Sequence, residues 1–354
     1  MNFGGTIRIN RFGLLIIACL LIILVYYNIS SSSSSEQPQK VNLRQLLLAA
    51  LEAAEKGGHE VVKGSHEPSA GAESKGETKE GVNIPVTKAD YNSHCVMFYG
   101  IAKTFPFLKV ISEEGENEKG CKNLTPLELN SNVPNLPDEE VLASDVAIWI
   151  DPLDATKEYT ERLFEYVTTM VCVSYQGKPI IGVIHKPFGS EPKTTWAWLN
   201  QAMSKNLQSI NDNTGITSKN VLVSMSHAGK AHDLIEPIFG KDAKLVPAAG
   251  SGYKTLEVTA GNATAYIHAS YISKWDICAG DAILTATGND LKMSNSKIVE
   301  IPSYQSYILE IKILGGFMVL EIPAHEMMSR SNNNLLTRSI FAKNLSEFRL
   351  FTNH

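Results

Sequence analysis

Two aspartates stand close together in the segment Trp149–Glu161, which reads WIDPLDATKEYTE. Alternating apolar residues before Asp151 predict a strand that ends there, and Pro152 predicts a turn that keeps Asp154 nearby. Two carboxylates held together on a turn repel each other unless a cation lies between them. Mg²⁺ prefers oxygen ligands, commonly a few carboxylates together with substrate phosphate. The spacing favours a metal site, and the alternative is a surface turn, because D-P-x-D also occurs by chance.

The same segment carries a second indication, which concerns phosphate. Ala155 and Thr156 are expected to open a helix, and the free N–H groups of a helix start suit a phosphate. A phosphate monoester is a dianion with a poor leaving group, so metal ions and a positioned water are suited to its hydrolysis. This chemistry needs positioning more than a covalent nucleophile, and no activated Ser or Cys is required.

Three signatures in order along the chain resemble those of the lithium-sensitive, Mg²⁺-dependent phosphatases of the inositol monophosphatase superfamily. They are ISEE at Ile111–Glu114, DPLDAT at Asp151–Thr156 and WDICAG at Trp275–Gly280. The continuation KEYTE and the segments KPIIGVIHKPF, VSMSHAG and GSGYK are similar to the 3′-nucleotidase branch. The similarity covers about Val41 to about Leu291. It implies an α/β (α+β) fold, a layered α-β-α-β-α sandwich.

The resemblance also implies a role for individual residues. It implies two or three Mg²⁺ per site, held by the side chains of Glu113, Asp151, Asp154 and Asp276 and by the backbone carbonyl of Leu153. Thr156 and Asp90 are then the catalytic pair that activates a water. The substrate is bound by Asp154, Ser224, His227, Gly250 and Lys254.

Simpler interpretations exist for several of these residues. Glu113 can be a solvated acid, and Asp90 and Asp276 can cap the helices that they begin. The roles of His227 and Lys254 depend on the resemblance alone. A P-loop is excluded, because GSGYKT lacks the G-x-x-x-x-G-K-[ST] spacing.

The substrate that the resemblance implies is adenosine 3′,5′-bisphosphate, which loses its 3′-phosphate to give AMP. Lys254 would hold the 5′-phosphate as a point charge. Clearing this product of sulfotransferases would support sulfation. Two alternatives stay open: an inositol phosphate as substrate on the same fold, and a non-catalytic scaffold. The complete set of predicted ligands argues against the scaffold.

The amino terminus holds an apolar segment. Gly13–Tyr27 carries no charge, and Arg8 and Arg11 precede it. These features predict a cytosolic segment 1–11, a single-pass signal anchor at 12–29 and a serine-rich stalk at 30–40. The alternative is a cleaved signal peptide. Both place the catalytic part in a lumen, and with the resemblance the anchor implies a Golgi membrane protein.

Composition and charge set the remaining bounds. Lys plus Arg is 32 and Asp plus Glu is 37, which gives a net charge of −5 and argues against nucleic acid as a partner.

The phosphatase domain is expected at 41–294, and segment 295–354 departs from the family pattern. Asn123, Asn262 and Asn344 lie in glycosylation sequons. A homodimer is allowed, and the cysteine spacing leaves disulfides and buried thiols open.

Local patterns predict the elements that must position these residues. Asn42 is expected to cap a helix from Leu43 that ends at Gly57-Gly58. A hairpin is expected over 166–175 and 179–185. Further helices are expected at 90–103 and 276–287, strands at 110–111, 146–150, 221–224 and 265–268, an exposed loop at 63–81, and irregular chain at 116–144.

Overall fold

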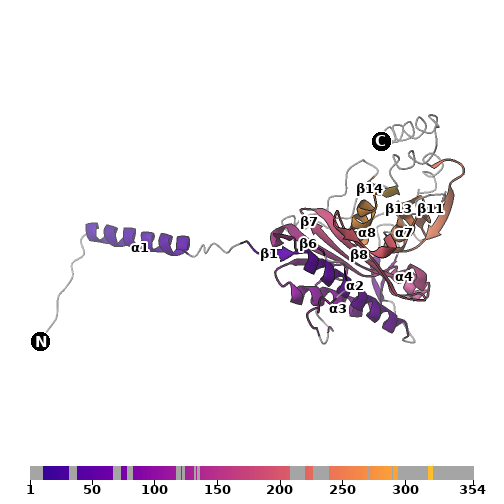
Figure 1. Cartoon of the computed structure of the whole chain (residues 1–354). Coiled ribbons are helices and arrows are strands. Elements are labelled where there is room, and N and C mark those ends of the chain that lie inside the picture. Colours follow the sequence, from indigo (N-terminus) through magenta and orange to yellow (C-terminus); the bar gives the residue numbers. More distant parts are fainter. Residues whose placement is uncertain are drawn as a thin grey trace, which may run out of the picture. The chain divides into compact units, whose positions relative to one another are not determined.

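The structure is a computed structural model of the chain (Figure 1). It describes residues 11–31, 38–66, 73–77, 83–116, 121, 124–130, 133, 136–207, 220–225, 239–268, 272–288, 290–293 and 318–321. The chain divides into two units, Met1–Gln39 and Lys40–His354. Each unit is described by itself.

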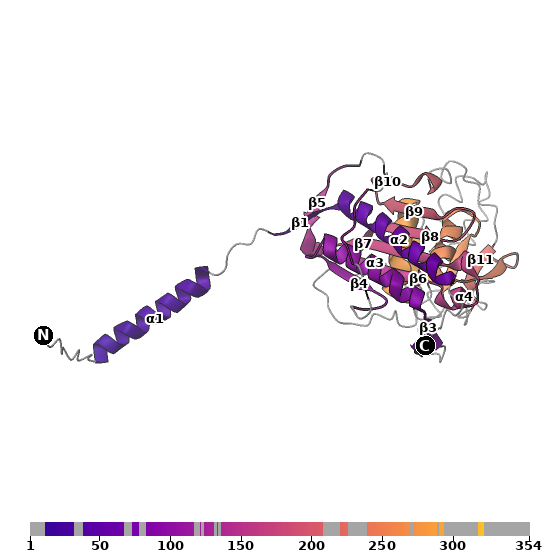
Figure 2. The ribbon, with the colours of Figure 1, turned by 90° about the horizontal axis from the view of Figure 1, so that it is seen from below.

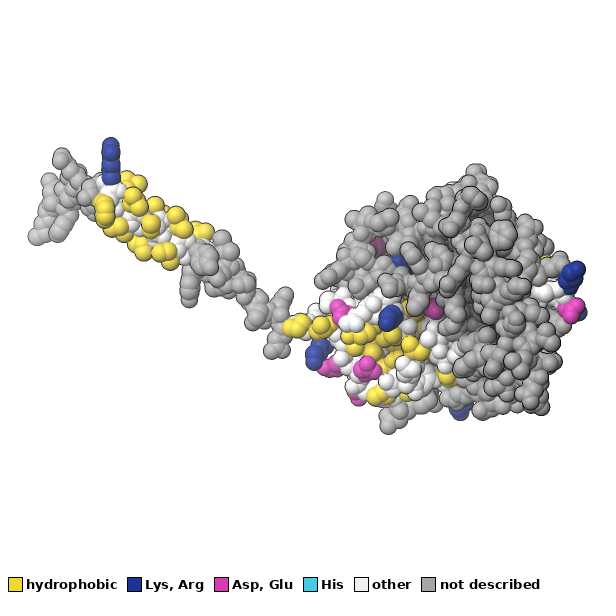
Figure 3. Space-filling model, turned by 90° about the horizontal axis from the view of Figure 1, so that it is seen from above, with side chains coloured by type: hydrophobic (Ala, Val, Ile, Leu, Met, Phe, Trp, Pro, Cys, Tyr) yellow, Lys and Arg dark blue, Asp and Glu magenta, His cyan; other side chains and the backbone are white. Residues whose placement is uncertain are grey.

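The first unit holds one helix, α1 (Arg11–Ser31). Its apolar side chains are exposed, from Phe12 to Val25, and Figure 3 shows them along the helix. Among the residues that the structure describes, no helix combines the length and the apolar character that a membrane crossing requires. The anchor at 12–29 stays a prediction.

In the second unit, two long helices cover one face of a sheet (Figure 2). They are α2 (Leu43–Ser65) and α3 (Lys88–Thr104). Asn42 caps α2 as predicted, because its side chain accepts a hydrogen bond from the backbone N–H of Gln45 at 3.1 Å. Apolar side chains of both helices and of the sheet form one core, including Leu46, Leu47, Ile101, Ile148 and Val171.

The prediction that Gly57-Gly58 ends the first helix is wrong. The helix continues to Ser65, and both glycines are buried in it. A Cβ on Gly57 would lie 2.3 Å from Sδ of Met97, and one on Gly58 would lie 2.4 Å from the ring of His185. The glycines therefore allow close packing against α3 and the sheet, which outweighs their low helix propensity.

The sheet under these helices has six strands in the order β10-β9-β8-β7-β6-β4. β4 runs parallel to β6, and the other neighbours are antiparallel. The predicted hairpin is confirmed as β7 and β8. The strands are β4 (Lys109–Ser112), β6 (Val146–Asp154), β7 (Thr168–Tyr175), β8 (Lys178–Lys186), β9 (Lys193–Trp198) and β10 (Ala202–Met203).

A second helical layer and a second sheet follow. The helices are α7 (Ser251–Thr259) and α8 (Lys274–Ala286). A second apolar core joins these helices to both sheets, through residues such as Met170, Ile277, Ile283 and Tyr266. The five-stranded sheet has the order β12 (Lys244–Ala248), β11 (Asn220–Ser224), β13 (Ala265–His268), β15 (Met318–Glu321) and β14 (Asp290–Met293).

The described elements thus form four layers in the expected order α-β-α-β. The fifth, helical layer of the predicted sandwich is not among the elements that the structure describes. β15 lies beyond residue 295 and pairs with β13 and β14, so the carboxyl-terminal segment contributes a strand to this sheet. The rest of 295–354 lies outside the described residues.

The small elements complete the description and correct two predictions. The loop expected at 63–81 contains the end of α2 and one strand of the hairpin β2 (Glu73–Glu77) and β3 (Asn83–Val86). The irregular segment expected at 116–144 contains β5 (Glu140–Leu142), which pairs with β1 (Lys40–Asn42). The remaining short elements are η1 (Ala143–Asp145), α4 (Thr156–Thr160) and η2 (Phe164–Tyr166).

Candidate metal and phosphate site

Three aspartates from two distant parts of the chain meet beside the six-stranded sheet. Asp151 and Asp154 come from the end of β6, and Asp276 comes from the first turn of α8. One carboxylate oxygen of each lies within 4.8 Å of the others. The structure therefore brings together three of the four carboxylates that the sequence predicts as metal ligands.

The end of β6 places its two aspartates by a local irregularity. The pairing of β6 with β7 shifts register between Asp151 and Asp154, and Ala155 adopts a left-handed conformation with φ 68°. Oδ1 of Asp151 accepts a hydrogen bond from the backbone N–H of Leu153 at 3.2 Å. Oδ2 of Asp151 is buried and has no hydrogen-bond partner among the described residues. A buried carboxylate oxygen without a donor is suited to a cation.

Asp154 connects this turn to the start of α7. Its Oδ2 accepts hydrogen bonds from the backbone N–H of Gly252 at 2.8 Å and from the hydroxyl of Thr168 at 3.2 Å. A Cβ on Gly252 would lie 2.4 Å from Oγ1 of Thr168. Gly250 has φ 66°, and a Cβ there would lie 2.6 Å from the carbonyl oxygen of Tyr166. The GSG sequence is thus required for the backbone to approach Asp154 so closely.

Asp276 caps α8, and its carboxylate also belongs to the aspartate cluster. Its Oδ2 accepts a hydrogen bond from the backbone N–H of Ser273 at 2.7 Å, so Asp276 and Ser273 form a capping box at the start of α8. The same carboxylate supplies an oxygen to the aspartate cluster. Capping therefore leaves Asp276 able to contribute an oxygen to the cluster.

The charges of the cluster disfavour its fully ionised form. Burial raises the pKa of Asp151 well above its usual value, and the charges of Glu113, Asp154 and Asp276 raise it further. Burial and the charges of Glu113 and Asp154 likewise raise the pKa of Asp276. A divalent cation would offset this repulsion. The residues therefore fit a hard cation such as Mg²⁺, by donor type, by mutual distance and by charge.

Asp90 is in contact with Thr156, the last residue of the DPLDAT segment. Oγ1 of Thr156 lies 2.9 Å from Oδ1 of Asp90 and 3.0 Å from the carbonyl oxygen of Leu153. A hydroxyl has one hydrogen, so it donates to one of these oxygens at a time and can accept from a water. Burial, together with the charge of Glu113, raises the pKa of Asp90 to about 6.

Asp90 also caps its own helix, which was the simpler interpretation. Its Oδ2 accepts from the backbone N–H and the hydroxyl of Thr87, at 2.7 and 2.6 Å. The two oxygens of one carboxylate thus serve different partners, the helix start and Thr156.

Glu113 lies close to the cluster, where it has a partner that the sequence did not indicate. Nζ of Lys75, on β2, lies 3.1 Å from Oε1 of Glu113 and also contacts Glu114. Burial lowers the pKa of Lys75, but the charges of Glu113 and Glu114 outweigh this and raise it. Burial and the neighbouring Glu113 raise the pKa of Glu114 to about 7. Lys75 was missed because one lysine in a charged stretch carries no pattern.

Ser224 lies at the carboxyl end of β11, Gly250 follows β12, and Lys254 lies in α7. β11 and β12 are parallel, and Ser224 pairs in register with Ala248, just before Gly250. Lys254 is buried, with Nζ 4.6 Å from the ring centre of Tyr266 and 3.4 Å from the carbonyl oxygen of Ala248. Burial lowers the pKa of Lys254 to about 8, although the negative charge of Asp154 acts to raise it. His227 lies outside the described residues.

Two disulfides lie within the second unit, Cys95–Cys121 and Cys172–Cys278. The sequence left disulfides and buried thiols as alternatives, because spacing does not reveal which cysteines meet. Cys172 is in β7 and Cys278 is in α8, one turn or less from Asp276.

Several known proteins are similar to this chain in sequence. The sequence model of the Inositol monophosphatase family matches residues 42–314. The chain is 47% identical over 270 residues to a protein of Drosophila melanogaster named "Putative inositol monophosphatase 3", covering 75% of each. It is 38% identical over 303 residues to a mouse protein named "Golgi-resident adenosine 3′,5′-bisphosphate 3′-phosphatase", covering 82% of this chain and 81% of the relative.

Solved structures show the same fold. CysQ from Bacteroides thetaiotaomicron, described as a bacterial member of the inositol monophosphatase family, aligns with a TM-score of 0.53 at 21% identity. The alignment covers 79% of this chain and 97% of CysQ. A Thermotoga maritima IMPase aligns with the same TM-score at 18% identity, over 84% and 97% of the two chains.

Proposed function

The chain belongs to the inositol monophosphatase family, and on that premise we propose that it is a Mg²⁺-dependent phosphatase that removes the 3′-phosphate of adenosine 3′,5′-bisphosphate. The observation that supports this most directly is the pairing of the aspartate cluster with the Asp90–Thr156 contact. The cluster provides a place for cations, and the contact provides a route for a proton.

The mechanism follows from the positions of these groups. Asp151, Asp154 and Asp276 would hold Mg²⁺, with Glu113 and the carbonyl of Leu153 as the further predicted ligands. When bound, Mg²⁺ neutralises the phosphate dianion and makes water beside it more acidic. Thr156 accepts a hydrogen bond from the attacking water and donates its own hydrogen to Oδ1 of Asp90.

The second sheet supports a nucleotide as the substrate. In open parallel sheets, ligands bind beyond the carboxyl ends of strands where the strand order reverses. β11 lies between β12 and β13 and is parallel to both, so the chain crosses over β11 between them. Ser224 and Gly250 lie at these strand ends, and Gly250 leads directly to the contact with Asp154. We assign Ser224, His227, Gly250 and Lys254 to the nucleotide within this proposal.

Lys254 would act there in a different manner from a surface lysine. Its ammonium is buried beside the ring of Tyr266, and its positive charge is attracted to the negative charge of Asp154. We therefore place it as a fixed positive charge behind the phosphate-binding region.

The proposed location is the Golgi membrane, with residues 12–29 as anchor and the phosphatase domain in the lumen. Two observations support it. Relatives from mouse, rat and cattle carry the words "Golgi-resident" in their names. Disulfides persist in oxidising compartments and are rare in the cytosol, and the second unit holds two of them. Resistance of the protein to alkaline carbonate extraction tests the anchor, and its release by carbonate would contradict it.

An inositol phosphate is the second candidate substrate. It is favoured by the names of the Drosophila melanogaster and zebrafish relatives, at 47% and 42% identity. Because both substrates are phosphate monoesters, the metal site is compatible with either.

The deciding experiment measures phosphate release by the purified full chain with Mg²⁺, with and without Li⁺. Adenosine 3′,5′-bisphosphate is compared with inositol 1-phosphate and inositol 1,4-bisphosphate. Asp151→Asn removes a cluster charge, and Asp138→Asn is the matched control, because Asp138 pairs with Arg44 at the surface. Release from the nucleotide that is lost only in Asp151→Asn supports the proposal. Release from the inositol phosphates alone overturns the substrate, and no release from any substrate overturns the activity.

A further inference from the structure

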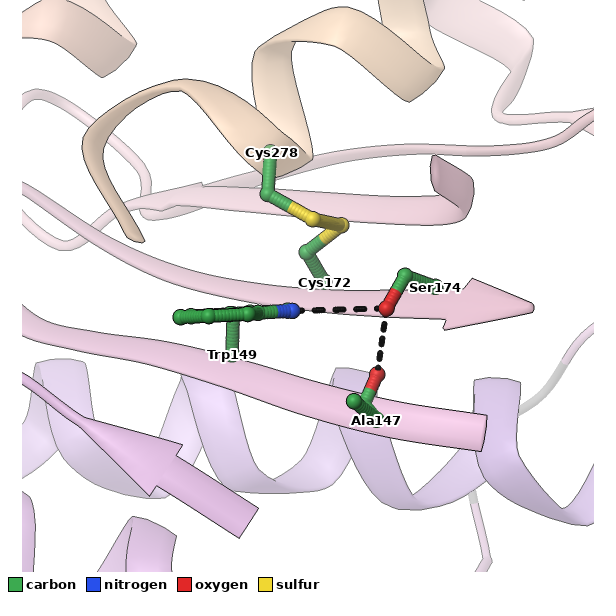
Figure 4. The surroundings of a disulfide bond; sticks show 5 residues. All are labelled: Ala147, Trp149, Cys172, Ser174 and Cys278. Carbon is green, nitrogen blue, oxygen red and sulfur yellow. Dashed lines mark hydrogen bonds between the residues drawn. A yellow bond between two sulfur atoms is a disulfide. The ribbon is translucent and has the colours of Figure 1, made fainter. Parts of the chain in front are cut away.

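The disulfide Cys172–Cys278 joins the six-stranded sheet to the helix that carries Asp276. Both cysteines are buried, and their Cα atoms lie 5.7 Å apart. Cys278 follows Asp276 by two residues in α8. Figure 4 shows the bond reaching from α8 down to β7. The linkage therefore fixes the start of α8 at one point above the sheet.

The sheet end of this linkage is close in register to the other two aspartates. Cys172 pairs with Trp149 across β6 and β7, and Trp149 precedes Asp151 by two residues on β6. The indole N–H of Trp149 donates to Oγ of Ser174 at 3.3 Å, and Ser174 donates to the carbonyl oxygen of Ala147 at 3.1 Å. These bonds tie β6 to β7 beside the disulfide (Figure 4).

α8 also rests directly on the sheet at this point. Gly182 of β8 pairs with Cys172 of β7. A Cβ on Gly182 would lie 2.2 Å from the carbonyl oxygen of Ala279, the residue after Cys278. The helix backbone thus approaches the strand backbone as closely as a glycine allows. A covalent bond and a close packing contact act on the same turn of α8.

The position of Asp276 relative to the other two aspartates depends on how α8 is held against the sheet. Carboxylate oxygens of Asp276, Asp151 and Asp154 lie within 4.8 Å of one another, and carboxylates that are this close repel one another when they are ionised. The capping bond to Ser273 lies within the start of α8, so it does not hold the helix to β6. The disulfide does hold it, because it links α8 to β7, the strand that pairs with β6.

We propose that Cys172 and Cys278 are positioning residues, whose disulfide holds Asp276 within ligand distance of Asp151 and Asp154 and so raises the affinity of the site for divalent cations. The proposal rests on the metal site of the proposed function and adds a cause for its geometry. Groups that orient metal ligands commonly contribute about 10- to 100-fold to metal affinity.

The test compares two disulfides of the same full-length chain. The variant Cys172→Ala/Cys278→Ala removes the proposed positioning bond. Cys95→Ala/Cys121→Ala is the matched control, because it removes a disulfide that links α3 to a segment without any predicted ligand. Mn²⁺ binding is measured by calorimetry without substrate, and circular dichroism verifies folding.

The expected result is an Mn²⁺ Kd raised about tenfold in Cys172→Ala/Cys278→Ala and unchanged in the control variant. In steady-state assays, the Mg²⁺ concentration for half-maximal rate should rise by the same factor, while kcat at saturating Mg²⁺ is kept. Equal Kd values in both variants and the unmodified chain would overturn the proposal.

Two further measurements keep the outcomes separate. If Cys172→Ala/Cys278→Ala does not fold, the unmodified protein is treated with a phosphine reductant, and its thiols are counted by mass spectrometry. The Mn²⁺ Kd of the folded, reduced protein is then compared with that of the oxidised protein. An unchanged Kd overturns the proposal. If Asp151→Asn does not weaken Mn²⁺ binding in the unmodified background, the metal site itself is wrong. A Kd that depends on Asp151 but not on the disulfide overturns the positioning role alone.

Discussion

The hydroxyl of Thr156 lies 2.9 Å from one carboxylate oxygen of Asp90, and the other oxygen of Asp90 is held by Thr87. The pair joins the first turn of α3 to the first residue of α4, two segments that are distant in sequence. Because Thr87 fixes the carboxylate, the orientation of Oδ1 toward Thr156 is set before any substrate binds. The contact is therefore preorganised for proton transfer.

Removal of the hydroxyl should affect the chemical step rather than cation binding. We expect Thr156→Ala to lower kcat by about 10²- to 10⁴-fold, which is the usual contribution of a positioned acid–base group. Thr156→Ser keeps the hydroxyl and should retain most of the activity. Steady-state kinetics with both variants, together with Mn²⁺ calorimetry, measures this. Equal losses in Thr156→Ala and Thr156→Ser would show that the hydroxyl is not the group that matters.

The pH profile should report the ionisation of Asp90. Its pKa is raised to about 6 by burial and by the charge of Glu113, and only the ionised form accepts a proton. The value of kcat/KM should therefore be constant above about pH 7 and decrease below about pH 6, by about tenfold per pH unit. Rates from pH 5 to pH 8 at saturating Mg²⁺ measure this. A rate that stays constant down to pH 5 would exclude Asp90 as the base.

Cation binding should stabilise the folded chain. The carboxylates of Asp151, Asp154 and Asp276 repel one another, and a ligand that binds only the folded state raises stability. Mg²⁺ at about 100 times its Kd contributes ~2.7 kcal/mol, or roughly 5–10 °C in Tm for a domain of this size. Thermal unfolding in EDTA and in Mg²⁺ measures the shift.

The variant Asp151→Asn should lose the Mg²⁺ effect on Tm in the same thermal unfolding experiment. It removes one repelling charge, so its Tm in EDTA should exceed that of the unmodified chain, and Mg²⁺ should no longer raise it. Asp138→Asn should keep the full Mg²⁺ response. A normal Mg²⁺ response in Asp151→Asn would contradict the assignment of the cluster.

Lys75 should reduce cation affinity through its charge. Its ammonium lies 3.1 Å from Glu113 and competes with a cation for that carboxylate. We expect Lys75→Gln to lower the Kd for Mn²⁺ by about two- to fivefold, the range of a partly exposed ion pair. The control is Lys109→Gln, because Lys109 pairs with the exposed Glu116. If Lys75→Gln instead raises the Kd, Lys75 holds Glu113 in position for the cation and does not compete with the cation for that carboxylate.

Local patterns were sufficient for the elements that carry the site. The alternation before Asp151 predicted the first part of β6, but the strand continues through Pro152 to Asp154, so the predicted end at Asp151 is wrong. The β-rich runs around a Gly turn predicted β7 and β8, and Asn42 predicted the start of α2. These features depend on neighbouring residues, so one sequence reveals them. The signatures then indicated which carboxylates share a site, and the structure brings three of them together.

Contacts between distant segments could not be predicted in the same manner. Gly57 does not end α2. It is needed because α2 packs so closely against Met97 that a Cβ would not fit, and no local pattern indicates that contact. Lys75 meets Glu113 only through the β2–β3 hairpin. The double role of Asp90 likewise appears only when Thr87 and Thr156 are both in place.

The two disulfides differ in how much chain separates their cysteines, 26 residues for Cys95–Cys121 and 106 for Cys172–Cys278. A ribosome delivers the amino-terminal part of a chain first. Cys95 and Cys121 are therefore both made before Cys172 and Cys278, so they are available to each other first. Once that bond is closed, Cys172 has only one cysteine of this domain left to join, and it arrives with α8. The order of synthesis thus favours the pairing that places Asp276 beside Asp151.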